Sequence, residues 1–182
     1  QFSFMPGYDA LARAPADRVN RIRWSKLSYI MQGSMNVLNP LRRIGKTFED
    51  FALRHIGGDR KAFLDHAASH LSRVRLEASV LHAYPHELSG GMRQRVTIAL
   101  ATICKPEFII ADEPTTALDV VVQKDVLAMI RQMQQEMGSS VLFVTHDMGV
   151  HAALTDRLGI MYAGRLVEEA PTAQLFTSPQ HP

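Results

Sequence analysis

Apolar residues follow two alternating periods along the chain, one typical of short strands and one typical of helices. Residues 108–111 and 141–144 are short continuous apolar runs, each fitting a strand that is buried on both faces. Between them, apolar residues recur at spacings of three and four over 120–137, which predicts a helix ending at Gly138, with its methionines in the core. Strand, crossover helix and strand make the basic unit of an α/β fold with a largely parallel sheet.

Shorter segments predict further strands on either side of this unit. Residues 26–31 have the composition of a strand and lead into Gln32. Residues 158–162 and 165–169 predict two more strands, which a turn at Ala163-Gly164 joins into a hairpin at the edge of the sheet.

The remaining pattern is helical. Apolar residues recur at helical spacing from about 37 to 80, and Gly57-Gly58 separates two of the predicted helices. A further helix is expected from Ser89 to Cys104, because Pro106 cannot continue it.

Composition narrows the class of protein. The chain has 182 residues, 46% of them hydrophobic, which is enough for one compact domain with its own core. Twenty basic and eighteen acidic residues are spread without a long basic run, so we expect no nucleic-acid partner. The single cysteine, Cys104, excludes an internal disulfide and is expected to fill space in the interior. No apolar stretch approaches the roughly 20 residues that cross a bilayer.

Two adjacent acids, Asp112 and Glu113, directly follow the strand 108–111. Open α/β sheets bind their ligands at the carboxyl ends of strands. In ATPases an Asp in this place helps to hold Mg²⁺, and a neighbouring acid can take a proton from the attacking water. The alternative interpretation is a helix N-cap followed by an acid of the first turn, which is common.

Ser89, Gly90 and Gly91 stand at the start of the helix predicted from Ser89. Glycines let a backbone come close to a ligand, and the first N–H groups of a helix favour an anion such as phosphate. The alternative is that Ser89 is an ordinary N-cap and the glycines form a flexible turn.

Together these segments resemble the motifs of the ATP-binding cassette (ABC) family, in the family's order and spacing, over roughly residues 24–182. The resemblance rests on a Q-loop glutamine (Gln32), the signature motif Leu-Ser-Gly-Gly-Met-Arg-Gln-Arg (88–95), the Walker B strand and its glutamate (108–115), the D-loop Ala-Leu-Asp (117–119) and the switch-histidine motif Thr-His-Asp (145–147).

The resemblance implies a role for each matching residue, with ATP and Mg²⁺ as ligands. Asp112 and Gln32 would serve the metal, and Gln32 would also sense the attacking water. Glu113 would be the general base and His146 would contact the γ-phosphate. Ser89, Gly90, Gly91 and Asp119 would face a second ABC ATPase subunit and the ATP bound there. Taken alone, Gln32 would be an ordinary loop glutamine and His146 a surface imidazole.

The segments 32–40 and 174–182 further resemble the oligopeptide, dipeptide and nickel importers, although Gly33-Ser34 replaces the Asp-Pro common there. The implied protein is an ATPase subunit at the cytoplasmic face of the membrane. It would pair with a second ATPase subunit, as a homodimer or heterodimer, and with permease subunits, and would indirectly serve a substrate-binding protein. Two alternatives stay open: a soluble ABC ATPase outside transport, and a structural fragment that binds no nucleotide.

One expected motif, the phosphate-binding (Walker A) loop, is missing. That loop needs Gly, four residues, then Gly-Lys-Ser/Thr, whereas Pro40 stands five positions before Gly45 in Gly45-Lys46-Thr47. We therefore expect a P-loop NTPase-like domain that is incomplete at its N-terminus and inactive alone. Its predicted parts are a core remnant with the Q-loop (1–34), an inserted helical subdomain ending in the signature helix (35–100) and the ATPase core (101–182).

Overall fold

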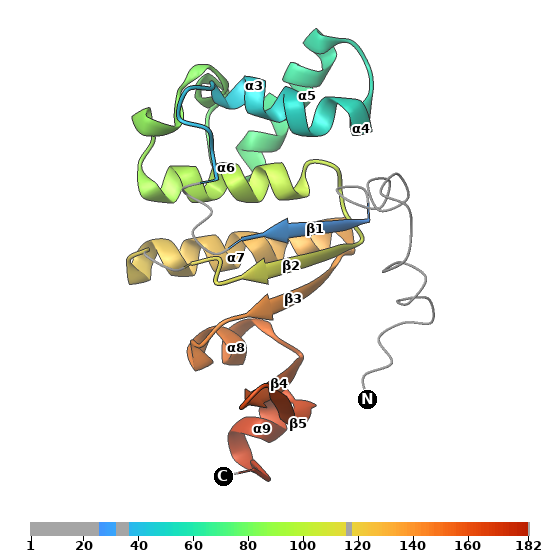
Figure 1. Ribbon diagram of the computed structural model, residues 1–182, viewed down its shortest axis with the longest axis vertical. Helices are drawn as coiled ribbons and strands as arrows, with labels where there is room; N and C mark the ends of the chain where they lie inside the picture. Colours follow the sequence, from blue (N-terminus) through green and yellow to red (C-terminus); the bar gives the residue numbers. More distant parts are fainter. Residues whose placement is uncertain (1–25, 32–36, 116–117, 182) are drawn as a thin grey trace.

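The structure is a computed structural model that describes residues 26–31, 37–115 and 118–181. Its centre is a parallel sheet in the order β1-β2-β3, formed by β1 (Leu27–Ile30), β2 (Phe108–Asp112) and β3 (Ser140–Val144). Leu27 pairs with Phe108, and Phe108 pairs with Ser140, so the three carboxyl ends lie at one edge of the sheet (Figure 1).

The connection from β1 to β2 carries most of the helices, which lie together beyond the β1 side of the sheet (Figure 1). They are α3 (Ile44–Phe48), the π-helical turn η2 (Glu49–Leu53), α4 (Arg54–Ile56), α5 (Arg60–Arg73), the short 3₁₀ turns η3 (Ala78–His82) and η4 (Pro85–Glu87), and α6 (Gly90–Thr102). Gly57 and Gly58, both with positive φ, separate α4 from α5 as the sequence predicts.

The long helix α7 (Val120–Met137) connects β2 to β3, which completes the predicted strand, crossover helix and strand. Asp119 caps its N-terminus by accepting hydrogen bonds from the N–H groups of Val121 and Val122. Gly138 ends it in the left-handed conformation, with φ of +66°. The shorter α8 (Met148–Leu154) follows β3 and is capped by Asp147.

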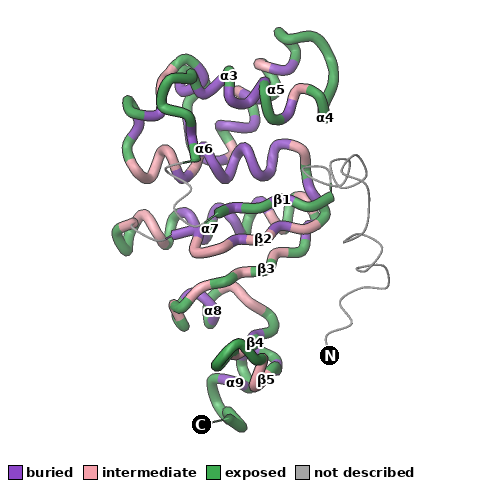
Figure 2. Tube along the Cα trace, in the orientation of Figure 1, coloured by how far each residue is buried: buried purple, intermediate pink, exposed green. Residues whose placement is uncertain are grey.

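The main core lies between the helices and the sheet. Figure 2 shows buried residues along much of α6, with further buried stretches in α5 and α7. Met129 and Met133 of α7 are buried there, which confirms the predicted role of the methionine stripe. Cys104 is only half buried, but it packs against this core, and burial raises the pKa of its thiol.

Two expectations about the second half were wrong. The strand β3 is not buried on both faces within the described residues, since Leu142 is 43% exposed and Val144 is 47% exposed. The hairpin of β4 (Arg157–Tyr162) and β5 (Arg165–Pro171) does not extend the parallel sheet. Because α8 leads the chain away from β3, the hairpin forms a separate antiparallel sheet, which packs with α9 (Thr172–Thr177) (Figure 1).

Among the described residues, no helix has the length and the apolar character needed to pass through a bilayer.

Candidate functional site

Asp112 is the last residue of β2 and lies at the carboxyl edge of the sheet. Its Oδ2 accepts a hydrogen bond of 2.7 Å from the hydroxyl of Tyr29 on the neighbouring strand β1. That hydrogen bond, together with burial and the nearby negative charge, raises the pKa of Tyr29 above its ordinary value. Asp112 is therefore not a helix cap, and its carboxylate is held at the edge where a ligand of the sheet would bind.

Glu113 leaves the strand in a conformation that side chains rarely adopt. Its φ is +46°, in the left-handed region, where a residue with a Cβ is strained. Its backbone N–H donates to the carbonyl of Val144 at 2.8 Å, which ties the end of β2 to the end of β3. The turn therefore aims the carboxylate of Glu113 at the segment that follows β3.

The carboxylate of Glu113 meets His146 there. Its Oε1 accepts from the backbone N–H of His146 at 3.2 Å and lies 2.6 Å from Nδ1 of the same residue. The hydroxyl of Thr145 donates to Oε2 at 3.5 Å. The Glu113 side chain is 16% exposed, whereas that of His146 is 84% exposed. The two residues, which the sequence singled out because each follows a predicted strand, thus form one pair.

This contact leaves only one ring nitrogen of His146, Nε2, able to contact a further partner. An ionised carboxylate only accepts hydrogen bonds, so Nδ1 must carry the proton that it shares with Glu113. Nε2 is then the ring nitrogen left for another partner, and it belongs to a largely exposed side chain. Glu113 can therefore act as a proton acceptor, and the imidazole of His146 lies beside it and extends toward solvent.

Asp147, next to His146, caps α8 and also contacts α7. Its Oδ2 accepts a 3.0 Å hydrogen bond from Nε2 of Gln123, and its Oδ1 accepts from the N–H of Gly149 at 2.8 Å. The bond from Gln123, followed by those from the backbone, lowers the pKa of Asp147. Sequence reasoning missed Gln123 and Tyr29, because nothing in their own neighbourhoods distinguishes them from other surface or strand residues.

The signature segment begins α6. The Oγ of Ser89 accepts from the N–H of Met92 at 3.2 Å, so Ser89 is an N-cap, as its alternative interpretation holds. Gly90 and Gly91 form the first turn, and the positive end of a helix dipole lies there. A Cβ on Gly91 would come within 3.0 Å of Cγ1 of Val122, so the start of α6 lies directly against the start of α7. An N-cap role does not exclude an anion at the same helix end.

Only part of the expected metal site can be placed. Gln32 lies outside the described residues. The described part of the chain contains no group of three or more His, Cys, Asp or Glu side chains that could hold a metal ion. Asp112 does fit Mg²⁺ as a single ligand, since its carboxylate oxygens are the hard donors that this ion prefers.

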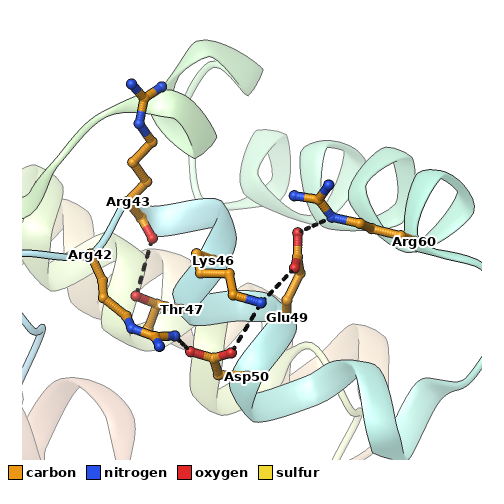
Figure 3. Close-up of polar contacts among 7 residues, drawn as sticks. All are labelled: Arg42, Arg43, Lys46, Thr47, Glu49, Asp50 and Arg60. Atoms are coloured by element: carbon orange, nitrogen blue, oxygen red, sulfur yellow. Dashed lines mark hydrogen bonds and ion pairs between the residues drawn. The ribbon is translucent and has the colours of Figure 1, made fainter.

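The Gly45-Lys46-Thr47 segment forms part of α3 and not a loop. Lys46 is paired with Glu49 at 3.1 Å and with Asp50 at 3.4 Å, and the Thr47 hydroxyl donates to the carbonyl of Arg43 (Figure 3). Burial raises the pKa of Glu49, but hydrogen bonds from Arg60 and Lys46 outweigh this and lower it overall. The lysine therefore serves the helical region, in agreement with the interpretation that this segment is no phosphate-binding loop.

Comparison with known proteins extends this local evidence. The sequence model of a family described as "ABC transporter" matches residues 10–116. The chain is 45% identical over 174 residues to a protein of Brucella abortus (strain 2308) named as a peptide import ATP-binding protein, covering 94% of this chain and 52% of that protein. It is 44% identical over 167 residues to a glutathione import ATP-binding protein of Salmonella typhimurium, covering 91% of this chain and 27% of that protein.

Solved structures agree with the sequence relatives. The ATP-binding cassette MJ0796, as a dimer bound to ADP and Pi, has a TM-score of 0.74 and 28% identity, over 88% of this chain and 68% of that one. The predicted α/β fold with a parallel sheet is thus confirmed, as is the resemblance to peptide importers. The chain spans about half the length of the Brucella relative.

Proposed function

The chain belongs to the ABC transporter family, and on that premise we propose that it forms part of the ATP-binding and ATP-hydrolysing subunit of an importer. The observation that supports this proposal most strongly is the contact between Oε1 of Glu113 and Nδ1 of His146, which lie 2.6 Å apart at the carboxyl edge of the sheet. The relatives named for peptide and glutathione import support the direction of transport.

In the proposed reaction a water molecule attacks the γ-phosphorus of ATP. The bond from that phosphorus to the bridging oxygen breaks, ADP keeps the electron pair, and the carboxylate of Glu113 takes the proton of the water. Since Nδ1 is engaged with Glu113, Nε2 of His146 would have to carry a proton of its own to donate to a γ-phosphate oxygen, which only accepts hydrogen bonds. Asp112 and Gln32 would hold Mg²⁺, which when bound would offset the negative charge of the phosphates.

The signature residues are proposed to act on a second subunit. Ser89, Gly90 and Gly91 would close over the ATP bound to that subunit, and Asp119 would lie at the same interface. The exposed start of α7 supports this, since Val120 is 66% exposed and Val121 is 75% exposed beside Asp119. The pair of subunits, identical or different, would work with membrane permeases at the cytoplasmic face of the cell membrane and indirectly with a substrate-binding protein.

The proposed cargo is a peptide. The names of the relatives and the segments 32–40 and 174–182 favour peptides, and nickel is the remaining alternative within the same branch. We also propose the division into a core remnant (1–34), a helical subdomain (35–100) and an ATPase core (101–182). Because the phosphate-binding loop is missing from this sequence, the 182-residue chain alone is proposed to be inactive.

The experiment that tests the function is Glu113→Gln in the full-length protein, meaning a polypeptide that contains this chain together with a phosphate-binding loop. Loss of the general base should reduce ATP turnover by about 100-fold or more while ATP still binds, and an ATP-loaded dimer should accumulate. Glu107→Gln is the matched control, because Glu107 is an exposed residue that pairs with Lys26 at the opposite end of β2. Turnover of Glu113→Gln within a few-fold of the control would reject Glu113 as the base.

A further inference from the structure

A buried glutamine connects α6 to the segment that carries Glu113. Gln94 is 4% exposed, and its side-chain amide donates a hydrogen bond to the backbone carbonyl of Pro114. Pro114 is itself buried and directly follows Glu113. The sequence of the signature motif contains Gln94, but neither its burial nor its partner 20 positions away follows from any local pattern.

With this hydrogen bond, the backbone is held both at Glu113 and at the residue directly after it. On one side, the N–H of Glu113 donates to the carbonyl of Val144 at 2.8 Å. On the other side, the next carbonyl along the chain, that of Pro114, is held by Gln94. Between these two fixed points Glu113 has a φ of +46°, which persists only where the surroundings impose it. Gln94 therefore holds the backbone directly after Glu113, as Val144 holds the backbone at Glu113 itself.

A second, independent contact joins α6 to the His146 side of the pair. Gly91 lies against Val122 in the first turn of α7. The following residue, Gln123, donates to Asp147, which is the neighbour of His146. The start of α6 is thus connected through packing and hydrogen bonds to both residues of the catalytic pair.

We propose that Gln94 is a positioning residue for Glu113, and that it couples the signature helix of one subunit to the base of that same subunit. The inference rests on the proposed function, in which Ser89, Gly90 and Gly91 face the ATP of the partner. A shift of α6 when these residues engage that ATP would move the carbonyl of Pro114 and, with it, the carboxylate of Glu113.

A purely structural role for Gln94 makes different predictions. A buried amide can stabilise a fold simply by satisfying a buried carbonyl, and its removal would then lower stability without a specific effect on turnover. Gln94→Met separates the two roles, because methionine has a similar length and shape but no donor.

The test measures steady-state ATP hydrolysis in the full-length protein, with thermal melting recorded for each variant. We expect Gln94→Met to lower kcat by about 10-fold with KM for ATP changed less than about two-fold, since Gln94 acts through Glu113 and not on bound ATP. Gln135→Met, at an exposed glutamine of α7, is the matched control and should match wild type.

A double variant makes the readout specific. If Gln94 acts by aiming Glu113, then Gln94→Met should have no further effect on the residual turnover of Glu113→Gln, because the base it positions is already lost. The same fold reduction in both backgrounds, or wild-type kcat in Gln94→Met, would overturn the inference. Absence of ATP hydrolysis in wild type, or no effect of Glu113→Gln, would instead remove the proposed function and the premise with it.

Discussion

His70, on the buried face of α5, should make the stability of the protein depend on pH. The residue is 3% exposed, and its Nε2 lies 3.0 Å from Oγ1 of Thr102 on α6. That hydroxyl donates to the carbonyl of Ile98 at 2.7 Å, so Nε2 is the donor of its contact with Thr102. Burial, followed by the nearby positive charges of Arg73 and His66, lowers the pKa of His70 from 6.5 to about 4.

The sign follows from proton binding. Between pH 6.5 and about 4 the unfolded chain protonates His70 and the folded chain does not, so acidification favours unfolding and stability rises with pH. At about 1.4 kcal/mol per pKa unit, the lowered pKa of His70 corresponds to a change of order 3 kcal/mol in the free energy of unfolding. Between pH 7.5 and pH 5 the expected loss is about 2 kcal/mol of unfolding free energy.

The assay is urea unfolding followed by circular dichroism at several pH values between 7.5 and 5, for wild type and His70→Gln. Carboxylates titrate alike in both proteins, so the difference between the two pH dependences isolates His70. The variant should lose about 2 kcal/mol less than wild type over this range. His55→Gln, at an exposed histidine of α4, serves as the control and should follow wild type. Parallel curves for wild type and His70→Gln would refute the reasoning.

Three further predictions follow from the site and its surroundings. Gly45→Ala should lower the unfolding free energy by about 1–3 kcal/mol in a urea titration, because its Cβ would lie 2.9 Å from the backbone oxygen of Leu81, whereas Gly159→Ala meets only a movable leucine methyl and should cost less than about 1 kcal/mol. Gly90→Asp in the full-length protein should leave ATP binding to the monomer intact but abolish ATP-dependent dimerisation in size-exclusion chromatography; a persisting dimer would reject the cross-subunit role. The 182-residue chain should bind MgATP with a Kd weaker than about 100 μM in isothermal titration, and tighter binding would show that another segment replaces the phosphate-binding loop.

The sequence predicted those elements whose signals are local. Gly138 ends α7 and Ser89 caps α6, because a left-handed glycine and a serine cap need only their own neighbours. The position of Asp112 and Glu113 at the edge of the sheet could be predicted for a similar reason, since a buried parallel strand places the residues at its end at one edge, whereas their catalytic roles stay predictions. The role of Gln32 stays a prediction.

Contacts between distant segments could not be predicted in this way. Tyr29 and Asp112 are 83 positions apart, and only the register of β1 against β2 brings them together. The left-handed turn at Glu113 has no sequence signal either, because left-handed turns normally favour glycine. The exposure of Leu142 was missed because an apolar run reports the composition of a strand but not which of its faces is covered.

The position of the helices between β1 and β2 also affects how the chain reaches this structure. Lys26 and Glu107, which immediately precede β1 and β2, are 81 positions apart, and closing so long a flexible loop costs about 4 kcal/mol of entropy. The β2–α7–β3 unit closes a shorter loop, since Glu113 and Thr145 are 32 positions apart. Helices α3 to α6 pack against one another, and once folded they shorten the path that β1 must close. We therefore expect β1 to join the sheet last, after the helical region has formed, so that the strand beside Asp112 completes the site at the final step of folding.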